Sequence, residues 1–173
     1  EKGFEAMTVD AVVADVGIGK ASLYKHFTSK EELAAAAMVR VLDRALDEVA
    51  RLRSGELDAV SRLKALAGWA YQQQIAGQMP ALPSQSSALR SVLVADKAYT
   101  ERLIQLSDAL GEWITEAQAD GRLDAALPPE LVLYSLYARA CDPVLPLLRA
   151  SGAYSDEQVV AWLVDICFRG LGA

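Results

Sequence analysis

The sequence predicts an all-α protein, and three features of its 173 residues support that class. More than half of the residues (53%) are apolar, so the chain can bury a core and is not disordered as a whole. No stretch alternates apolar and polar residues for long enough to be a convincing strand. Apolar residues instead recur three or four positions apart, the spacing that gives a helix one apolar face. We therefore expect an N-terminal helix-turn-helix unit of three helices, followed by a larger helical bundle.

Two short helices are predicted at the start of that unit. Thr8 can cap a first helix whose valines stand three or four residues apart and which ends at Gly17. A tight turn over residues 17–19 then leads into a second helix over about residues 20–27. Leu23 and Phe27 share one face of this second helix, so they can pack on the valines of the first.

The third helix of the unit has a clear start and a clear end. Ser29 and Glu32 have the spacing of a capping box, and an amphipathic pattern continues to about Arg53, where a Ser-Gly pair breaks it. We place a domain boundary there. Residues 1–53 form the predicted helix-turn-helix domain with its connecting helix, and residues 54–173 form the second, helical domain.

Helices are predicted for the second domain as well. Ser155 and Gln158 form another capping box. Pro143 and Pro146 cannot lie inside a regular helix without removing hydrogen bonds, so we expect a kink or break there. The predicted helices cover about residues 57–78, 84–95, 97–119, 129–141 and 155–171.

The net charge of −6 argues at first against a nucleic-acid binder, but its distribution is uneven. Residues 17–30 contain Lys20, Lys25 and Lys30 and no acidic residue, whereas residues 54–173 contain 9 Lys/Arg against 14 Asp/Glu, a balance of −5. Screening confines each charge to about 8–10 Å, so a basic face on an acidic body can still bind phosphate.

The second helix offers a short, basic face rich in small residues, opposite Leu23 and Phe27. Such a face can enter a major groove about 12 Å wide. Lys30 stands at the start of the next helix, where backbone N–H groups also favour a phosphate. The side chains of this face are Lys20, Ala21, Ser22, Tyr24 and Lys25.

This segment resembles the TetR (tetracycline repressor) family of bacterial regulators. The residues that carry the resemblance are Gly3-Phe4, Thr8, Gly17-Ile18, Leu23-Tyr24-Lys25-His26-Phe27 and Ser29-Lys30-Glu31-Glu32-Leu33. The resemblance implies phosphate contacts from Thr8, Tyr24 and Lys30, and base or backbone contacts from Lys20, Ala21, Ser22, Lys25 and His26. One departure is Gly19, which stands where the family commonly has a Ser or Thr that caps the recognition helix, so the start of this helix is expected to be looser.

Other interpretations remain open at this stage. His26 can be a packing residue as well as a phosphate contact. The chain can be a helical interaction module without DNA binding, although the intact lysines and Tyr24 argue against that. An activator would present the same DNA face as a repressor. We do not expect an enzyme, since the sequence suggests no Ser-His or Cys-His arrangement and no cluster of His, Cys, Asp or Glu with metal-ligand spacing.

Helix-turn-helix proteins usually bind DNA as dimers, because a two-fold protein matches two half-sites. The last two predicted helices carry much apolar surface for such a homodimer, and the resemblance implies the same pairing; they can also simply close the core of one chain. The predicted interface comprises Leu131, Tyr134, Ala138, Val159, Trp162 and Ile166.

The resemblance also implies an effector pocket among the middle helices, which would make the second domain an effector-binding and dimerisation domain. Aromatic and polar residues suited to it are Trp69, Tyr71, Gln72, Met79, Trp113 and Tyr137, which can equally be core residues. The expected function is repression at a double-stranded operator, released by a small-molecule effector of unknown identity.

No cofactor or metal is expected. Cys141 and Cys167 lie far apart without ligand spacing and are expected to be buried, reduced thiols. The sequence shows no unbroken apolar run of about 18 residues and no secretory signal, so we expect a cytoplasmic protein that associates with the nucleoid when bound to DNA, and no membrane partner.

Overall fold

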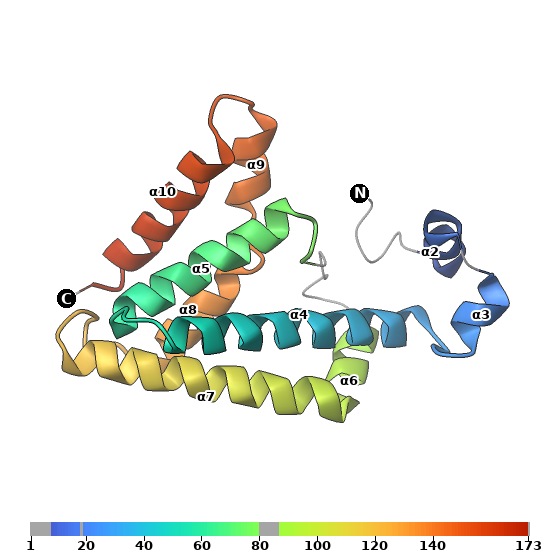
Figure 1. Ribbon diagram of the computed structural model, residues 1–173, viewed down its shortest axis with the longest axis horizontal. Helices are drawn as coiled ribbons and strands as arrows, with labels where there is room; N and C mark the ends of the chain where they lie inside the picture. Colours follow the sequence, from blue (N-terminus) through green and yellow to red (C-terminus); the bar gives the residue numbers. More distant parts are fainter. Residues whose placement is uncertain (1–7, 18, 80–86, 173) are drawn as a thin grey trace. The chain divides into compact units, whose positions relative to one another are not determined.

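The computed structural model describes residues 8–17, 19–79 and 87–172, and these ranges contain helices and no strand (Figure 1). The all-α prediction is confirmed. The helices are α2 (Val9–Val16), α3 (Lys20–Tyr24), α4 (Lys30–Arg53), α5 (Ala59–Ile75), α6 (Ser87–Ala95), α7 (Lys97–Ala119), α8 (Pro129–Arg139), α9 (Val144–Ala150) and α10 (Asp156–Arg169).

Helix α9 was not predicted as a separate helix, although the break before it was. Helix α8 ends at Arg139 and Pro143 precedes α9, so the chain breaks where the two prolines indicated. Pro146 nevertheless lies inside α9, in its first turn. The first N–H groups of a helix have no partner within it, so a proline there removes no hydrogen bond.

The chain divides into two compact units by its packing. The first comprises residues 1–43 and 80–103, and the second comprises residues 44–79 and 104–173. Helices α4 and α7 each contribute residues to both. The predicted functional boundary at residue 53 remains a prediction.

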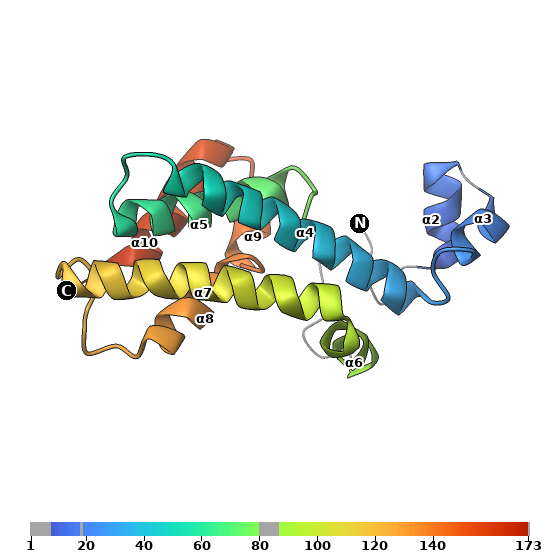
Figure 2. The ribbon, with the colours of Figure 1, turned by 60° about the horizontal axis from the view of Figure 1, so that its bottom comes forward.

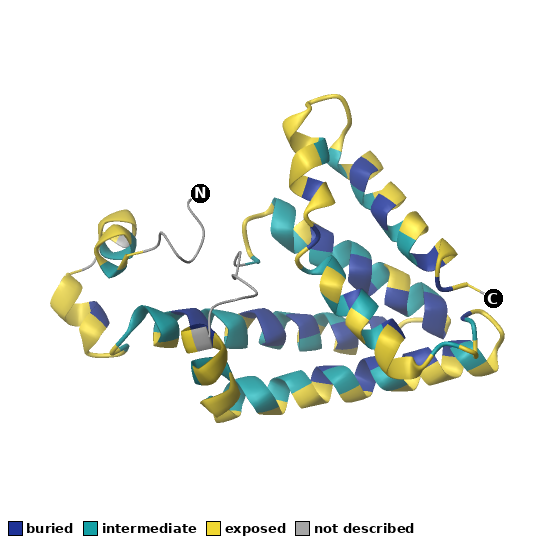
Figure 3. Cartoon of the chain, turned by 180° about the vertical axis from the view of Figure 1, so that it is seen from behind, coloured by how far each residue is buried: buried dark blue, intermediate teal, exposed yellow. Residues whose placement is uncertain are grey.

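In the first unit, the early part of α4 packs on α6. Ala34 and Leu89 form a small buried cluster, with Leu93 against it. Asp43 forms an ion pair with Arg102 of α7. Few side chains of α2 and α3 are buried, as the exposed colouring of these helices in Figure 3 shows.

The second unit has the larger core. Helix α10 packs on α5 and α9, and α5 also packs on α8 (Figures 1 and 2). One buried cluster combines the side chains of three of these helices, namely Tyr71 of α5, Leu145 of α9, and Val159 and Leu163 of α10.

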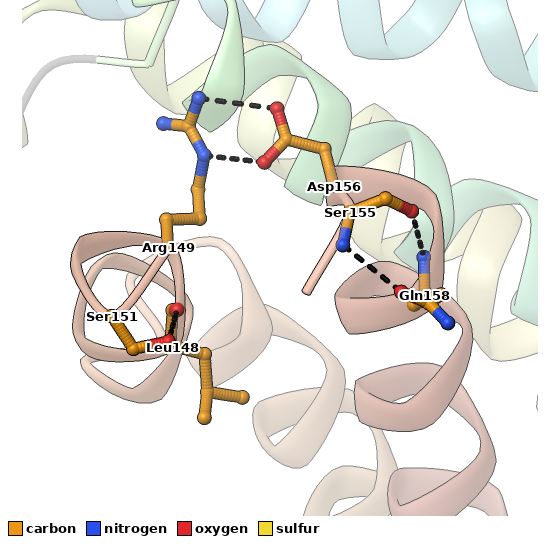
Figure 4. A network of polar contacts seen from close by, with 6 residues as sticks. All are labelled: Leu148, Arg149, Ser151, Ser155, Asp156 and Gln158. Carbon is orange, nitrogen blue, oxygen red and sulfur yellow. Dashed lines mark hydrogen bonds and ion pairs between the residues drawn. The ribbon is translucent and has the colours of Figure 1, made fainter. Parts of the chain in front are cut away.

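The start of α10 is fixed by two local features (Figure 4). The predicted capping box is present: the Gln158 N–H donates to Ser155 Oγ at 3.2 Å, and the Ser155 N–H donates to Gln158 Oε1 at 3.0 Å. Arg149 of α9 donates from two nitrogens to both carboxylate oxygens of Asp156, at 2.7 and 3.1 Å. These bonds join α9 to α10.

One stretch, Pro129–Ala150, has the length and composition of a membrane-spanning helix. In the structure, the turn around residues 140–143 divides this stretch into α8 and α9. Only 22% of its most apolar window is buried within the chain. The observation therefore concerns length and composition only.

Candidate nucleic-acid interface

Helix α2 is bounded at both ends as its sequence predicts. The Thr8 hydroxyl oxygen accepts a hydrogen bond from the Ala11 N–H at 3.2 Å and so caps the first turn. Gly17 follows the last turn with φ 71° and ψ 25°, the left-handed conformation that favours glycine, and its N–H donates to the Val13 carbonyl. The chain can therefore turn sharply from α2 towards α3.

Helix α3 buries one side chain and exposes the rest. Leu23 is 8% exposed, whereas Tyr24 is 45% exposed. The residues predicted to face DNA in and directly after α3 are all exposed: Lys20, Ala21, Ser22, Tyr24, Lys25 and His26. The structure thus brings these residues together on a short exposed segment.

The end of α3 comes earlier than predicted, at Tyr24 instead of residue 27. The N–H groups of His26 and Phe27 both donate to the Leu23 carbonyl at 3.0 Å, so the chain closes a turn there instead of continuing the helix. Lys25 and His26 consequently lie in the connection that follows α3.

The start of α4 differs from the predicted capping box in one bond. The Glu32 N–H donates to Ser29 Oγ at 3.1 Å, as expected. The Glu32 carboxylate, however, accepts from the Thr28 N–H at 2.7 Å rather than from Ser29. This bond lowers the pKa of Glu32, because it stabilises the charged form. Lys30, a predicted phosphate contact, is the first residue of α4 and is half-buried.

Sequence reasoning missed one charged residue of this surface. Asp10, in the first turn of α2, forms an ion pair with Lys20, with Oδ1 and Nζ 2.6 Å apart. The pair raises the pKa of Lys20, first through the hydrogen bond and then through the charge of Asp10. A charge count that starts at residue 17 leaves Asp10 out, although the acidic residue lies only ten positions before the lysine.

The residues predicted for an effector pocket all belong to the second unit but differ in their burial and in their contacts. Tyr71 and Trp113 are fully buried, and the Arg62 guanidinium lies 5.8 Å from the centre of the Trp113 ring. The hydroxyl oxygens of Tyr137 and Ser107 lie 2.8 Å apart. The remaining three are less buried: Trp69 and Met79 are half-buried, and Gln72 is exposed.

A buried polar cluster next to Tyr71 was not predicted. Asp142, which is 3% exposed, accepts hydrogen bonds from the Tyr71 hydroxyl at 3.0 Å and from Arg139 at 2.7 Å. Its other oxygen accepts from the Val144 N–H at 2.9 Å. Burial, together with the neighbouring carboxylate, raises the pKa of Tyr71 far above its usual range. The cluster links α5 to the break between α8 and α9.

The predicted dimer residues fall into two groups. Five of them are exposed in the single chain, namely Leu131, Tyr134, Ala138, Trp162 and Ile166, with Tyr134 and Ile166 more than 60% exposed. Val159, in contrast, is fully buried in the core of its own chain. The Trp162 ring packs edge-on against Tyr154, with centroids 5.1 Å apart.

The described residues contain no group of three or more His, Cys, Asp or Glu side chains that could hold a metal ion. Cys141 is exposed and Cys167 is half-buried, and both are free thiols. Partial burial raises the pKa of the Cys167 thiol. The expectation that both cysteines are buried is therefore wrong for Cys141, which lies at the break that follows α8.

Two helices joined by a tight glycine turn, the second presenting an exposed polar face, define a helix-turn-helix protein. Comparison with known proteins shows a family likeness over the N-terminal region. Residues 1–37 match the family model of the bacterial regulatory proteins of the TetR family. A comparison with curated protein sequences gave no match.

Solved structures of regulators have the same fold. The fatty acid degradation regulator FadR from Bacillus halodurans is 18% identical, with a TM-score of 0.73, over 99% of this chain and 89% of that one. FadR from Bacillus subtilis, solved with stearoyl-CoA, is 14% identical (TM-score 0.71; 98% and 91% covered). AibR, solved with isovaleryl coenzyme A and operator DNA, is 19% identical (TM-score 0.60; 96% and 90% covered). The predicted resemblance to the TetR family is confirmed in sequence over residues 1–37, and the solved regulators share the fold of this chain over nearly its whole length.

Proposed function

We propose that this chain is a sequence-specific DNA-binding transcriptional regulator, and not an enzyme, that places α3 in the major groove of an operator. The observation that carries the proposal is the arrangement of α3, which turns Leu23 inward and leaves a short basic segment exposed. Thr8, Tyr24 and Lys30 contact phosphates, and Lys20, Ala21, Ser22, Lys25 and His26 contact bases or backbone. Phosphate contacts fix the register, and base contacts supply the specificity.

A duplex selected from a random library by the wild-type protein provides the probe, and a shuffled duplex of the same composition provides the reference. Tyr24→Phe should weaken binding to both duplexes about equally, since a phosphate contact carries no sequence information. Lys25→Met should weaken binding to the selected duplex more, by about 1–3 kcal/mol for a good base contact.

The matched control is Lys64→Met, which removes the same charge from an exposed position on α5. Fluorescence anisotropy measures all three variants. If the control loses as much affinity as Lys25→Met, net charge and not the α3 surface is responsible. A wild-type protein that selects no duplex contradicts the proposed function itself.

The regulator acts as a homodimer through α8 and α10. Leu131, Tyr134, Ala138, Trp162 and Ile166 are apolar or aromatic and exposed in the single chain, and a second copy would cover them. An interface of this kind uses each contact twice, because the same patch is present on both copies. Val159, which is buried, packs α10 onto the core of its own chain.

Ile166→Glu tests the dimer. Two carboxylates would be desolvated near the two-fold axis, which opposes association by several kcal/mol. Glutamate is a good helix former, so α10 should persist. Light scattering should show a monomer and circular dichroism an unchanged helix content. Ala161→Glu is the matched control, since Ala161 is exposed on the same helix but lies on another side of it. A dimeric Ile166→Glu variant would place the interface elsewhere.

The regulator is a repressor that a small-molecule effector releases from DNA. Two regulators of this fold were solved with acyl-CoA thioesters, so this class of molecule is the first to test. Helix α4 contributes residues to both units, which makes it a connection along which effector binding can change DNA affinity. Stearoyl-CoA and isovaleryl-CoA should lower the affinity for the selected duplex, with free CoA as the control; a rise in affinity would indicate the opposite sign of coupling.

A further inference from the structure

Helix α3 starts without a side-chain cap. Its N-cap residue is Gly19, with φ −72° and ψ 137°, and no side chain accepts a hydrogen bond from the first turn. Five other helices, α2, α4, α5, α7 and α10, have caps of this kind, from Thr8, Ser29, Asp58, Asp96 and Ser155. An N-cap side chain fixes the residue at which a helix begins. Helix α3 therefore depends on another contact to fix its start.

The ion pair between Asp10 and Lys20 provides that contact. Lys20 is the first residue of α3, and Asp10 belongs to the first turn of α2. The Nζ–Oδ1 distance of 2.6 Å is that of a charge-assisted hydrogen bond. Among the residues that the structure describes, this is the ion pair that joins α2 to α3.

Exposure limits what this pair does for overall stability, since both side chains are more than half exposed. Its effect on α3 is different. That helix has five residues and one buried side chain, Leu23, so a single contact at its start can decide how its exposed face is oriented. Base contacts depend on orientation to a greater extent than phosphate contacts do.

We propose that Asp10 is a positioning residue for DNA recognition, which holds Lys20 and thereby the start of α3 in place of the missing cap. The proposal deepens the proposed function and rests on it. It also predicts that removing this carboxylate has opposite effects on the binding of unrelated DNA and of the operator. Removing the charge of Asp10 lowers the repulsion of phosphates, so Asp10→Asn should keep or raise the affinity for a shuffled duplex while it lowers the affinity for the operator.

Gly19 allows a rescue experiment. Its backbone has the extended conformation of an N-cap residue, and an added Cβ would meet no atom within 4 Å. A serine at this position can therefore accept a hydrogen bond from the first turn of α3 without a clash. Gly19→Ser should fix the start of the helix independently of Asp10. Gly19→Ala adds the Cβ and the backbone restriction without the hydroxyl, and is the matched control.

The experiment compares wild type, Asp10→Asn, Asp10→Asn/Gly19→Ser and Asp10→Asn/Gly19→Ala. Fluorescence anisotropy measures the affinity of each for the duplex selected by the wild type and for the shuffled duplex. Asp10→Asn should reduce the ratio of the two affinities about tenfold, the size of one good base contact. Gly19→Ser should restore the ratio to within about twofold of wild type, and Gly19→Ala should not.

Each other outcome has a distinct meaning. An unchanged ratio in Asp10→Asn overturns the positioning role, and so does an equal loss of affinity for both duplexes, which would report local unfolding. A ratio that Gly19→Ser and Gly19→Ala restore equally overturns the capping argument. If the wild-type protein does not prefer its selected duplex, the proposed function fails as well.

Discussion

The helix-turn-helix segment and the core of the second unit are stabilised in different ways. In α2 and α3, Leu23 is the described side chain that is buried, and the rest of the order comes from a cap, a glycine turn and one exposed ion pair. In α5, α9 and α10, side chains far apart in the sequence bury one another completely. The helix-turn-helix segment is therefore open to local adjustment, whereas changes in the bundle should act on the whole cooperative unit.

The largest effect should come from the buried carboxylate of the bundle. Asp142→Ala leaves the Tyr71 hydroxyl and Arg139 without their acceptor. Breaking a buried ion pair costs about 3–5 kcal/mol, and the partial exposure of Arg139 reduces this to about 2–4 kcal/mol. Urea unfolding followed by circular dichroism should show the loss as a lower midpoint for the bundle.

Tyr71→Phe is the matched control for that measurement. It removes one hydrogen bond and keeps the ring, so the loss should be about 1 kcal/mol. If both variants lose the same amount, the hydrogen bond between Tyr71 and Asp142 accounts for the whole loss, and the contact of Asp142 with Arg139 contributes nothing to stability.

The second effect should be smaller and confined to the helix-turn-helix segment. Leu23→Ala removes the buried contact of α3 and should cost about 2 kcal/mol, at the low end for leucine because the surrounding core is small. Hydrogen exchange should speed up over residues 9–27 and stay unchanged in α5 and α10. A uniform increase along the chain would contradict the contrast between the two regions.

This contrast also explains which features the sequence could predict. Caps and glycine turns depend on residues within four positions of one another, so Thr8, Gly17 and the Ser155–Gln158 box were all predicted correctly. The break before α9 followed from proline chemistry, which is equally local. The exposed face of α3 was predicted for the same reason, because the spacing of residues within one or two helical turns determines which side chains share a face.

Contacts between distant residues could not be predicted in this way. Tyr71 and Asp142 are 71 positions apart, and nothing in the pattern around either residue indicates the other. Asp10 and Lys20 are only ten positions apart, but their ion pair depends on the angle between α2 and α3. Val159 was predicted at the dimer interface because its helical stripe continues to Trp162 and Ile166, and the stripe alone does not show where the core ends.

The smallest expected effect concerns the N-cap of α5 in the second unit. A cap acts locally, so its contribution to stability should depend little on the surrounding bundle. Asp58 accepts a hydrogen bond from the Ser61 N–H at 2.8 Å at the start of α5, and Arg122 lies 3.3 Å from its other oxygen. The pKa of Asp58 is lowered, first by its hydrogen bonds with Ser61 and then by the charges of Arg122 and Lys64. Asp58→Ala should lower the Tm slightly at neutral pH, and Asp58→Asn should lower it less, because asparagine is an equally good cap.

The pH dependence of this effect has a definite sign. Because the pKa of Asp58 is lower in the folded chain than in the unfolded one, the stabilisation is fully present above the unfolded value of about 3.9. It is lost as the pH falls through the folded value, where the carboxylate takes up a proton and the charged cap disappears.

The Tm difference between wild type and Asp58→Ala should therefore be constant near pH 7 and shrink below about pH 4. The difference between Asp58→Asn and Asp58→Ala should persist, since neither side chain titrates. Calorimetry from pH 7 to pH 3 measures both differences, and a gap between wild type and Asp58→Ala that stays constant to pH 3 would show that the charge of Asp58 plays no part in starting α5.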